Sequence, residues 1–426
     1  MSDVVGSSDT TNARGAAITL AVAFAFVFVS RGVADIWMVF LLPIESDFAA
    51  SRQQSAGVYS TYMVVSGLSA PLAGLLLQRY SPRACYLSGT LLICAGVSLA
   101  SLAGALWHLY LFIGVFVSLG ISGIGIVPAA ALIGRWYTRR MSTAMAVAYA
   151  GLGTGSLLLV PLAQWSIEWQ GWRATYASLG LVLAGLSVAT LLLPWRRIAG
   201  GSVAAVRAQG QDGASIRPWA AAAGLTLREA IRTREFAGLA VSFGFTGFAM
   251  YVVIVQTVPF LIEIGHSPLH AATLFGLCGM LSIVGVVSAG WLCDRFGLRP
   301  VALLTFALTL TGMLCLLVLS YQFAQWVVVA YVLSFGLAQG GRGPIIATLT
   351  NRLFSGPSAS ALYGIVYASS MVGAGIGSWA SGFLHDVSAS YRPSLFLAVV
   401  GICVAAAPFF VVSAFRLPAP IASSRP

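Results

Sequence analysis

Charged residues are scarce in this sequence, and one kind is missing altogether. Only 8% of the 426 residues are Asp, Glu, Lys or Arg, against roughly 25% in an ordinary globular protein. The 23 basic residues are all Arg, so the chain has no Lys, and apolar residues make up 58% of it. So few charges cannot cover the surface of soluble domains. The composition therefore predicts an integral membrane protein.

Signatures of enzymes and metal sites are also missing. The six Cys include no CxxC pair, which argues against a disulfide framework or a zinc site. There is no GxSxG elbow and no P-loop, and the glycine runs at 151–155 and 373–377 lie in apolar stretches, where we expect close helix packing. His266 and His270 are four residues apart beside Pro268, without a third ligand nearby. We expect no enzyme activity, no cofactor and no metal.

Long apolar stretches define the fold. A helix that crosses the hydrocarbon core needs about 20 mostly apolar residues, and twelve such stretches form two sets of six. They cover roughly 16–43, 56–78, 84–106, 109–134, 141–165, 173–194, 236–262, 268–293, 299–321, 324–350, 358–384 and 393–415. The sequence predicts an all-α integral membrane protein with twelve transmembrane helices in two six-helix halves.

The polar segments between these stretches set the expected organisation. Charges and Gly/Ser content mark a solvated linker between the two sets of spans. Around Leu225–Arg234 this linker either forms a short amphipathic helix on the membrane surface or has no regular structure. The expected parts are an N-terminal tail (1–15), an N-terminal half (16–194), the linker (195–235), a C-terminal half (236–415) and a C-terminal tail (416–426).

The arginines predict how the chain is oriented in the membrane. With both termini in the cytoplasm, 18 of the 23 Arg lie in inner segments and two lie within spans. Only Arg52, Arg173 and Arg392 lie outside. Cytoplasmic loops are enriched in basic residues, so we expect a multi-pass protein of the plasma (inner) membrane. Arginines clustered between apolar stretches do not form one basic face, which argues against nucleic-acid binding. The polar N-terminus lacks the basic region and short apolar core of a cleaved signal.

The two halves are related by an internal repeat. Three features recur at an offset of 216 residues: GLLLQRYSPR from Gly74 and GWLCDRFGLR from Gly290, Pro43 and Pro259, and Pro128 and Pro344. Duplicated six-helix halves with a substrate site between them are a recurring plan of transporters. The repeat therefore favours a transporter.

At this point the chain resembles the major facilitator superfamily. GWLCDRFGLR fits that family's G-x-x-x-D-R-x-G-x-R loop after span 8, whereas the loop after span 2 has Gln78 where the family usually places Asp. The region from Trp136 to Gly155 resembles monocarboxylate transporter-like and oxalate:formate antiporter-like members, although the Asp/Arg pair in helix 8 of the animal transporters is missing. The resemblance implies the twelve-helix fold, with helices 1, 4, 7 and 10 around a central cavity.

Three charged residues lie within the predicted spans. Charge there is costly and marks a functional site by default. Arg31 and Asp35 are four residues apart on one helix face, and Arg342 lies in a Gly-Gly-Arg-Gly-Pro run. The resemblance implies that the three face one another across the repeat. An Arg fork matches a carboxylate and stays charged, so Arg31 and Arg342 are candidate substrate-binding residues. The alternatives are an ion pair that only stabilises packing for Arg31, and snorkelling for Arg342.

Asp35 is the leading candidate for proton coupling, because it is the one carboxylate well inside a span; structural pairing with Arg31 is the alternative. Further substrate contacts are expected among polar side chains of the spans, of which we expect two or three to matter: Tyr59, Tyr62, Tyr149, Tyr251, Gln256, Tyr363 and Tyr367. The resemblance implies an inner gate of charged residues: Arg79, Arg83, Asp294, Arg295 and Arg299.

Together these features predict a monomeric secondary active transporter of small organic anions, monocarboxylates or aromatic carboxylates, working by alternating access. Proton symport is the favoured mode. Anion exchange and efflux of drugs or metabolites are the alternatives, and two Arg with one Asp suit anions better than lipophilic cations. A non-transporting membrane sensor would need a signalling domain, and the longest polar segment is about forty residues. A channel is disfavoured because no filter motif is visible.

Overall fold

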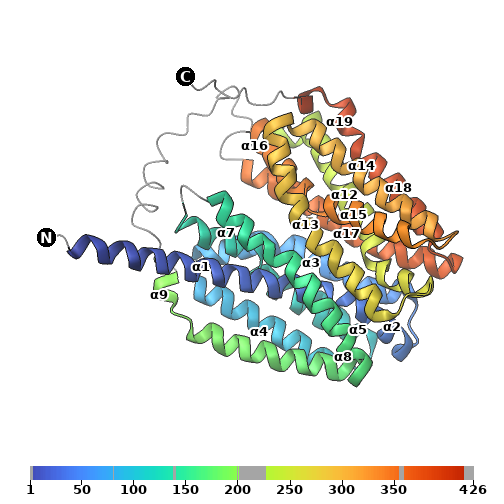
Figure 1. The fold of residues 1–426 in the computed structure, drawn as a ribbon, viewed down its shortest axis with the longest axis horizontal. Coiled ribbons are helices and arrows are strands. Elements are labelled where there is room, and N and C mark those ends of the chain that lie inside the picture. The colour runs from blue at the N-terminus through green and yellow to red at the C-terminus, as the bar shows by residue number, and fades with distance from the viewer. Residues whose placement is uncertain are drawn as a thin grey trace. The chain divides into compact units, whose positions relative to one another are not determined.

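The computed structural model describes residues 3–79, 81–137, 141–198, 200, 227–354 and 359–416. Regular structure in these ranges is helical (Figure 1). The elements are α1 (Asp3–Asp35), α2 (Trp37–Phe48), α3 (Arg52–Arg79), α4 (Pro82–Ser101), α5 (Leu106–Leu109), the π-helix η1 (Tyr110–Val117), α6 (Ser118–Ile124), α7 (Ile126–Gly134), α8 (Met141–Leu192), α9 (Trp195–Ile198), α11 (Leu227–Ile231), α12 (Arg234–Glu263), α13 (Pro268–Phe296), α14 (Leu298–Leu319), α15 (Gln325–Gln339), α16 (Arg342–Leu353), α17 (Ala359–Ser388), α18 (Arg392–Ala406), α19 (Pro408–Val411) and the 3₁₀ helix η2 (Ser413–Arg416).

Each of the twelve predicted spans coincides with one or more of these helices. By length and composition, eight helices in the described part of the chain are long and apolar enough to cross a membrane. The fifth and sixth spans run together in α8, whose two halves meet at Gly171 with φ 80° and ψ 166°. Glycine adopts this backbone conformation without the steric cost that a Cβ would bring. The predicted all-α membrane fold is confirmed.

Four spans are interrupted, and one of these breaks is at Ala407 of the twelfth, between α18 and α19. The first breaks at Ile36, between α1 and α2, and the fourth breaks at Gly125, where ψ is −151°. The tenth breaks at Gly340 and Gly341, between α15 and α16. Pro344 follows this break and has no N–H to donate to the carbonyl of Gly340. Such breaks inside a membrane are tolerated where the freed backbone groups are buried in protein or line a cavity.

One compact unit combines residues 1–36 with 68–217. In it, α1 and α4 both pack against α8. The contact of α1 with α8 needs glycine: a Cβ on Gly151 would lie 2.7 Å from the carbonyl oxygen of Phe24, and one on Gly155 would meet the carbonyl of Phe28. Close packing was predicted for this glycine run and is confirmed. It brings the end of α1 that carries Asp35 against α8.

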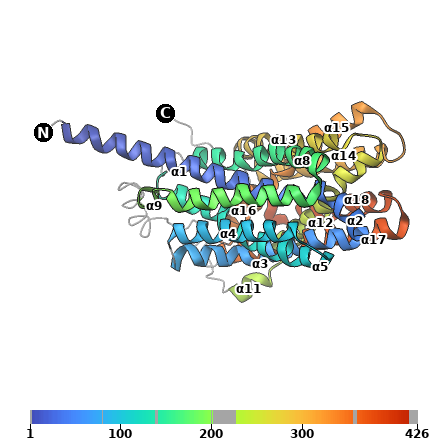
Figure 2. The same cartoon turned by 90° about the horizontal axis from the view of Figure 1, so that it is seen from below.

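The second unit combines residues 37–67 with 218–426. Here α12 packs against α17 and α18 (Figure 2). A Cβ on Gly373 would meet the carbonyl oxygen of Gly244, and one on Gly377 would meet that of Phe248. The second glycine run is thus also a helix-packing surface, as predicted. The boundaries of the two sequence halves stay a prediction.

The cysteines lead to a first test. All six are free thiols: Cys85, Cys94, Cys278, Cys293, Cys315 and Cys403. We therefore expect the same melting temperature with and without a reducing agent, measured by intrinsic fluorescence in detergent. An intramolecular disulfide in peptides from the native protein, detected by mass spectrometry, would contradict this expectation.

Candidate functional site

The Asp35 carboxylate ends α1 and is held in place by two side chains. Arg31 Nε donates to Asp35 Oδ2 at 2.7 Å, and Ser156 Oγ of α8 donates to the same oxygen. Asp35 is 1% exposed and Arg31 26%. The other carboxylate oxygen, Oδ1, is buried and has no hydrogen-bond partner among the described residues. The ion pair of Arg31 with Asp35, given above as the alternative to substrate binding by Arg31, is present. The substrate-binding role of Arg31 and the coupling role of Asp35 stay predictions.

Arg342 is the first residue of α16 and is 3% exposed. Its Nη2 contacts Met250 Sδ of α12 at 3.2 Å, and its Cζ lies 5.1 Å from the centroid of the Phe306 ring in α14. Nε and Nη1 are buried without a hydrogen-bond partner in the described part of the chain. A thioether and a ring face replace little of the hydration that this cation loses on burial. The geometry does not support snorkelling, because the charged group is enclosed by apolar side chains.

Five of the six predicted tyrosines lie in two groups within the second unit, and Tyr149 lies in the first unit. In the second unit, Tyr59 stacks on Tyr62 with ring centroids 5.2 Å apart and lies 6.0 Å from Tyr251. Tyr367 neighbours Tyr363 and Phe243, with both centroid distances 6.4 Å. Tyr149 lies partly buried in α8 of the first unit. Their roles as substrate contacts stay a prediction, as does the expectation that Arg31, Asp35 and Arg342 line one cavity.

Two of the predicted gate arginines bind helix ends. Arg299 Nε donates to the carbonyl oxygen of Phe409 at 2.9 Å, and Arg83 Nη2 donates to that of Leu191 at 3.4 Å. Both acceptors lie near the C-terminal ends of α19 and α8, where carbonyls lack partners within their own helix. In this structure these arginines therefore hold neighbouring helices together.

The remaining predicted gate residues are Arg295, Arg79 and Asp294. Arg295 is exposed, with its Cζ 5.5 Å from the ring centroid of Trp291 and 5.6 Å from that of Phe296. The side chains of Arg79 and Asp294 lie outside the described residues. The inner gate therefore stays a prediction.

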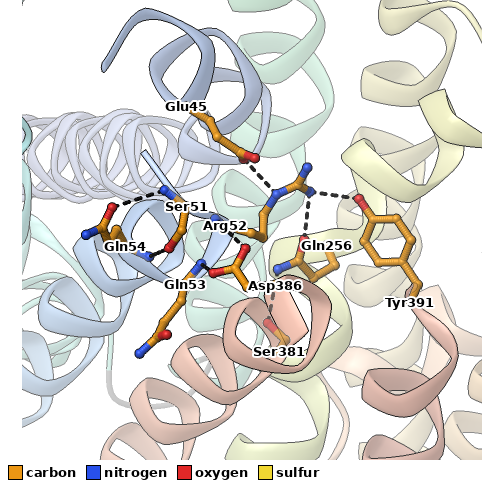
Figure 3. A network of polar contacts seen from close by, with 9 residues as sticks. All are labelled: Glu45, Ser51, Arg52, Gln53, Gln54, Gln256, Ser381, Asp386 and Tyr391. Atoms are coloured by element: carbon orange, nitrogen blue, oxygen red, sulfur yellow. Dashed lines mark hydrogen bonds and ion pairs between the residues drawn. The ribbon is translucent and has the colours of Figure 1, made fainter. Parts of the chain in front are cut away.

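A network around Arg52 was not predicted. Arg52 is 6% exposed, and its guanidinium meets Glu45, Gln256 and Tyr391 (Figure 3). Gln256 was expected to bind substrate, but its oxygen accepts from Arg52 at 3.2 Å and its nitrogen donates to Ser381 at 3.2 Å. Sequence reasoning treated Arg52 as an ordinary outer charge, since two of its partners, Gln256 and Tyr391, lie more than 200 residues away.

The apolar helices define a multi-pass membrane protein, and the family to which the chain belongs makes it a transporter rather than an enzyme. The family model of the Major Facilitator Superfamily matches residues 20–354 and again 283–426. The chain belongs to this superfamily, which confirms the resemblance found in its loop motif.

Individual relatives agree with this assignment. The chain is 29% identical over 415 residues to monocarboxylate transporter 12 of Rattus norvegicus (92% of this chain, 84% of the relative). It is 28% identical over 396 residues to monocarboxylate transporter 13 of Bos taurus (90% and 87%).

Among solved structures, a bacterial homologue of the human lysosomal transporter Spinster, inward-facing and unoccupied, superposes with a TM-score of 0.69 at 16% identity (94% of this chain, 97% of that one). A POT family transporter in complex with 5-aminolevulinic acid gives 0.69 at 14% identity (92% and 94%). At these identities, the solved structures show the fold alone.

Proposed function

We propose that this protein is a proton-coupled transporter of small monocarboxylates. The observation that carries the proposal is the Arg342 guanidinium, which is buried and has two nitrogens without a hydrogen-bond partner in the described part of the chain. A carboxylate presents two oxygens at the spacing of an Arg fork and would neutralise the charge. Met250 and Phe306 beside it would suit the apolar part of an organic acid better than a second charge.

The breaks in the helices support a substrate site near Arg342. Transporters of this architecture place substrate and coupling ions at discontinuous helices, where freed backbone groups and helix ends meet the ligand. Asp35 lies beside the break in span 1, and Arg342 lies directly after the break in span 10. Asp35 would carry the proton on its Oδ1, which has no hydrogen-bond partner among the described residues. The names of the relatives, monocarboxylate transporters 12 and 13, point to the same substrate class.

The arginine distribution supports the expected topology, with both termini in the cytoplasm. That the protein is a monomer of the plasma membrane is part of the proposal. In that orientation a proton gradient directed inward would drive carboxylate uptake.

Uptake into proteoliposomes tests the proposal. We expect a labelled monocarboxylate, such as lactate or benzoate, to accumulate above equilibrium when the outside is made acidic, and to stop accumulating when a protonophore collapses the gradient. Empty liposomes and a neutral sugar are the controls. Exchange without gradient-driven accumulation would support anion exchange instead. Uptake of a sugar or a cationic dye without any carboxylate would refute the assignment.

A further inference from the structure

Residues 37–67, comprising α2 and the first half of α3, have an unexpected structural partner. By the sequence repeat they belong to the N-terminal half, yet they form a compact unit with the C-terminal helices. α2 packs against α12 and α13, and a Cβ on Gly382 of α17 would lie 2.7 Å from the Cα of Gln53. We call this contact of residues 37–67 with α12, α13 and α17 the seam. The arginine distribution predicts that the seam lies on the outer side of the membrane.

Arg52 ties this seam together through its side chain (Figure 3). Its Nε forms an ion pair with Glu45 Oε2 at 2.7 Å. Its Nη1 donates to Tyr391 Oη at 2.7 Å and to Gln256 Oε1 at 3.2 Å. Glu45 belongs to the same segment as Arg52, whereas Tyr391 and Gln256 belong to the C-terminal half. The Glu45 carboxylate thus fixes the guanidinium, whose other donors then cross the seam.

Asp386 crosses the same seam from α17. Its two carboxylate oxygens accept the backbone N–H groups of Arg52 and Gln53, each at 2.8 Å. The first amides of a helix lack partners within the helix, and a carboxylate there also interacts favourably with the helix dipole.

The start of α3 nevertheless has a cap of its own. Ser51 N donates to Gln54 Oε1 at 3.0 Å, and Gln54 N donates to Ser51 Oγ at 3.2 Å. This reciprocal pair is a capping box and is sufficient to define the helix end. Asp386 therefore adds attachment between helices rather than helix initiation.

Two serines continue the seam deeper along α3 and α17. Ser378 Oγ donates to the carbonyl oxygen of Ala56 at 3.1 Å, and Ser60 Oγ donates to that of Gly375 at 2.5 Å. Ser378 is completely buried. Rocking of one half against the other would have to break the serine, aspartate and arginine contacts together.

We propose that Arg52, Glu45, Asp386, Gln256 and Tyr391 form an outer latch, which holds the α2–α3 segment against α12 and α17 and opens once in each transport cycle. Opening exposes all these groups to water, which replaces their hydrogen bonds, so the latch stabilises the closed state only moderately. A small difference in free energy between the closed and the open latch suits a contact that must open and reform. The proposal goes beyond substrate identity and holds whichever solute is carried.

Labelling of a buried thiol tests the latch without any substrate. In a full-length protein whose six native Cys are replaced by Ala or Ser, Ser378→Cys places a thiol inside the seam. Its reaction with a membrane-impermeant maleimide should be slow, because the seam must open first. Arg52→Gln should raise the labelling rate about tenfold, since a lost hydrogen bond to a charged group shifts the closed–open equilibrium by roughly that factor or more.

Arg392→Gln is the matched control, because Arg392 is an exposed outer arginine that contacts Ser320 and Tyr321 rather than the latch. We expect it to leave the labelling rate unchanged. Tyr391→Phe removes one hydroxyl from the latch and should raise the rate by a smaller factor, which provides a second test if Arg52→Gln folds poorly. Equal labelling rates in Tyr391→Phe, Arg52→Gln and the control would overturn the proposal.

A disulfide across the seam tests whether the latch must open during transport. In the same cysteine-free protein, Ala56→Cys with Ser378→Cys joins α3 to α17, and oxidation should stop transport until a reducing agent restores it. Normal transport by the oxidised protein would show that the seam need not open. If carboxylates are not the substrate, the labelling result is unaffected, so the two proposals fail separately.

Discussion

Replacing Arg342 with Gln should reduce carboxylate binding by ten- to a hundredfold and nearly abolish transport. The guanidinium has two buried nitrogens with no hydrogen-bond partner among the described residues, so a bound carboxylate would be its main counter-charge. A hydrogen bond to a charged group contributes about 1.5–3 kcal/mol, and about 1.4 kcal/mol corresponds to a tenfold change in affinity. Binding of the labelled acid to the purified variant, measured by scintillation proximity, checks the expectation.

A second substitution separates the contribution of the positive charge of Arg342 from that of its planar geometry. Arg342→Lys keeps one positive charge but loses the planar fork, so we expect binding between that of the wild type and Arg342→Gln. Membrane insertion should not suffer in Arg342→Gln, because placing an arginine at mid-membrane costs roughly 2.5–3.5 kcal/mol on insertion scales. Wild-type affinity in Arg342→Gln would remove this residue from the site.

Local patterns in the sequence predicted the features that depend on neighbouring residues. The i,i+4 spacing of Arg31 and Asp35 made an ion pair one of two interpretations, because residues four apart lie on one helix face, and the pair is present. The glycine runs predicted close packing, since only glycine lets another backbone approach so closely. Apolar length predicted the helices. The site residues named from the sequence beyond these are consistent with the fold but stay predictions.

Features that depend on distant parts of the chain could not be predicted in the same way. Asp386 is 334 residues from Arg52, and no periodicity connects a helix start in one half with a helix end in the other. The outer charges looked like ordinary loop residues, because a solvated and a latched arginine have the same sequence context. The break at Ile36 is equally hidden, because the nearest proline, Pro43, lies within the helical part of α2. Tertiary packing decides both features.

Substitutions in the Arg31–Asp35 pair should have the second large effect on transport, and they distinguish a role of Asp35 in proton coupling from a purely structural role. Asp35→Asn should eliminate gradient-driven accumulation of carboxylate, because the amide cannot carry the proton. It should also slow exchange, because it leaves Arg31 without its partner. Breaking a fully buried ion pair destabilises a protein by roughly 3–5 kcal/mol. Because Arg31 is 26% exposed, we expect a smaller destabilisation here. Accumulation and counterflow exchange are measured in the same proteoliposomes.

The double variant Arg31→Gln with Asp35→Asn resolves the two roles. Removing both charges relieves the uncompensated arginine, so exchange should recover much of what Asp35→Asn loses, unless Arg31 itself binds substrate. Accumulation should remain absent, because the carboxylate that takes the proton on Oδ1 is gone. Ser156→Ala is the control: it removes one hydrogen bond to Asp35 but keeps both charges, so accumulation should persist at a reduced rate. Full recovery of accumulation in the double variant would mean that Asp35 only holds Arg31 in place, and that the proton is carried elsewhere.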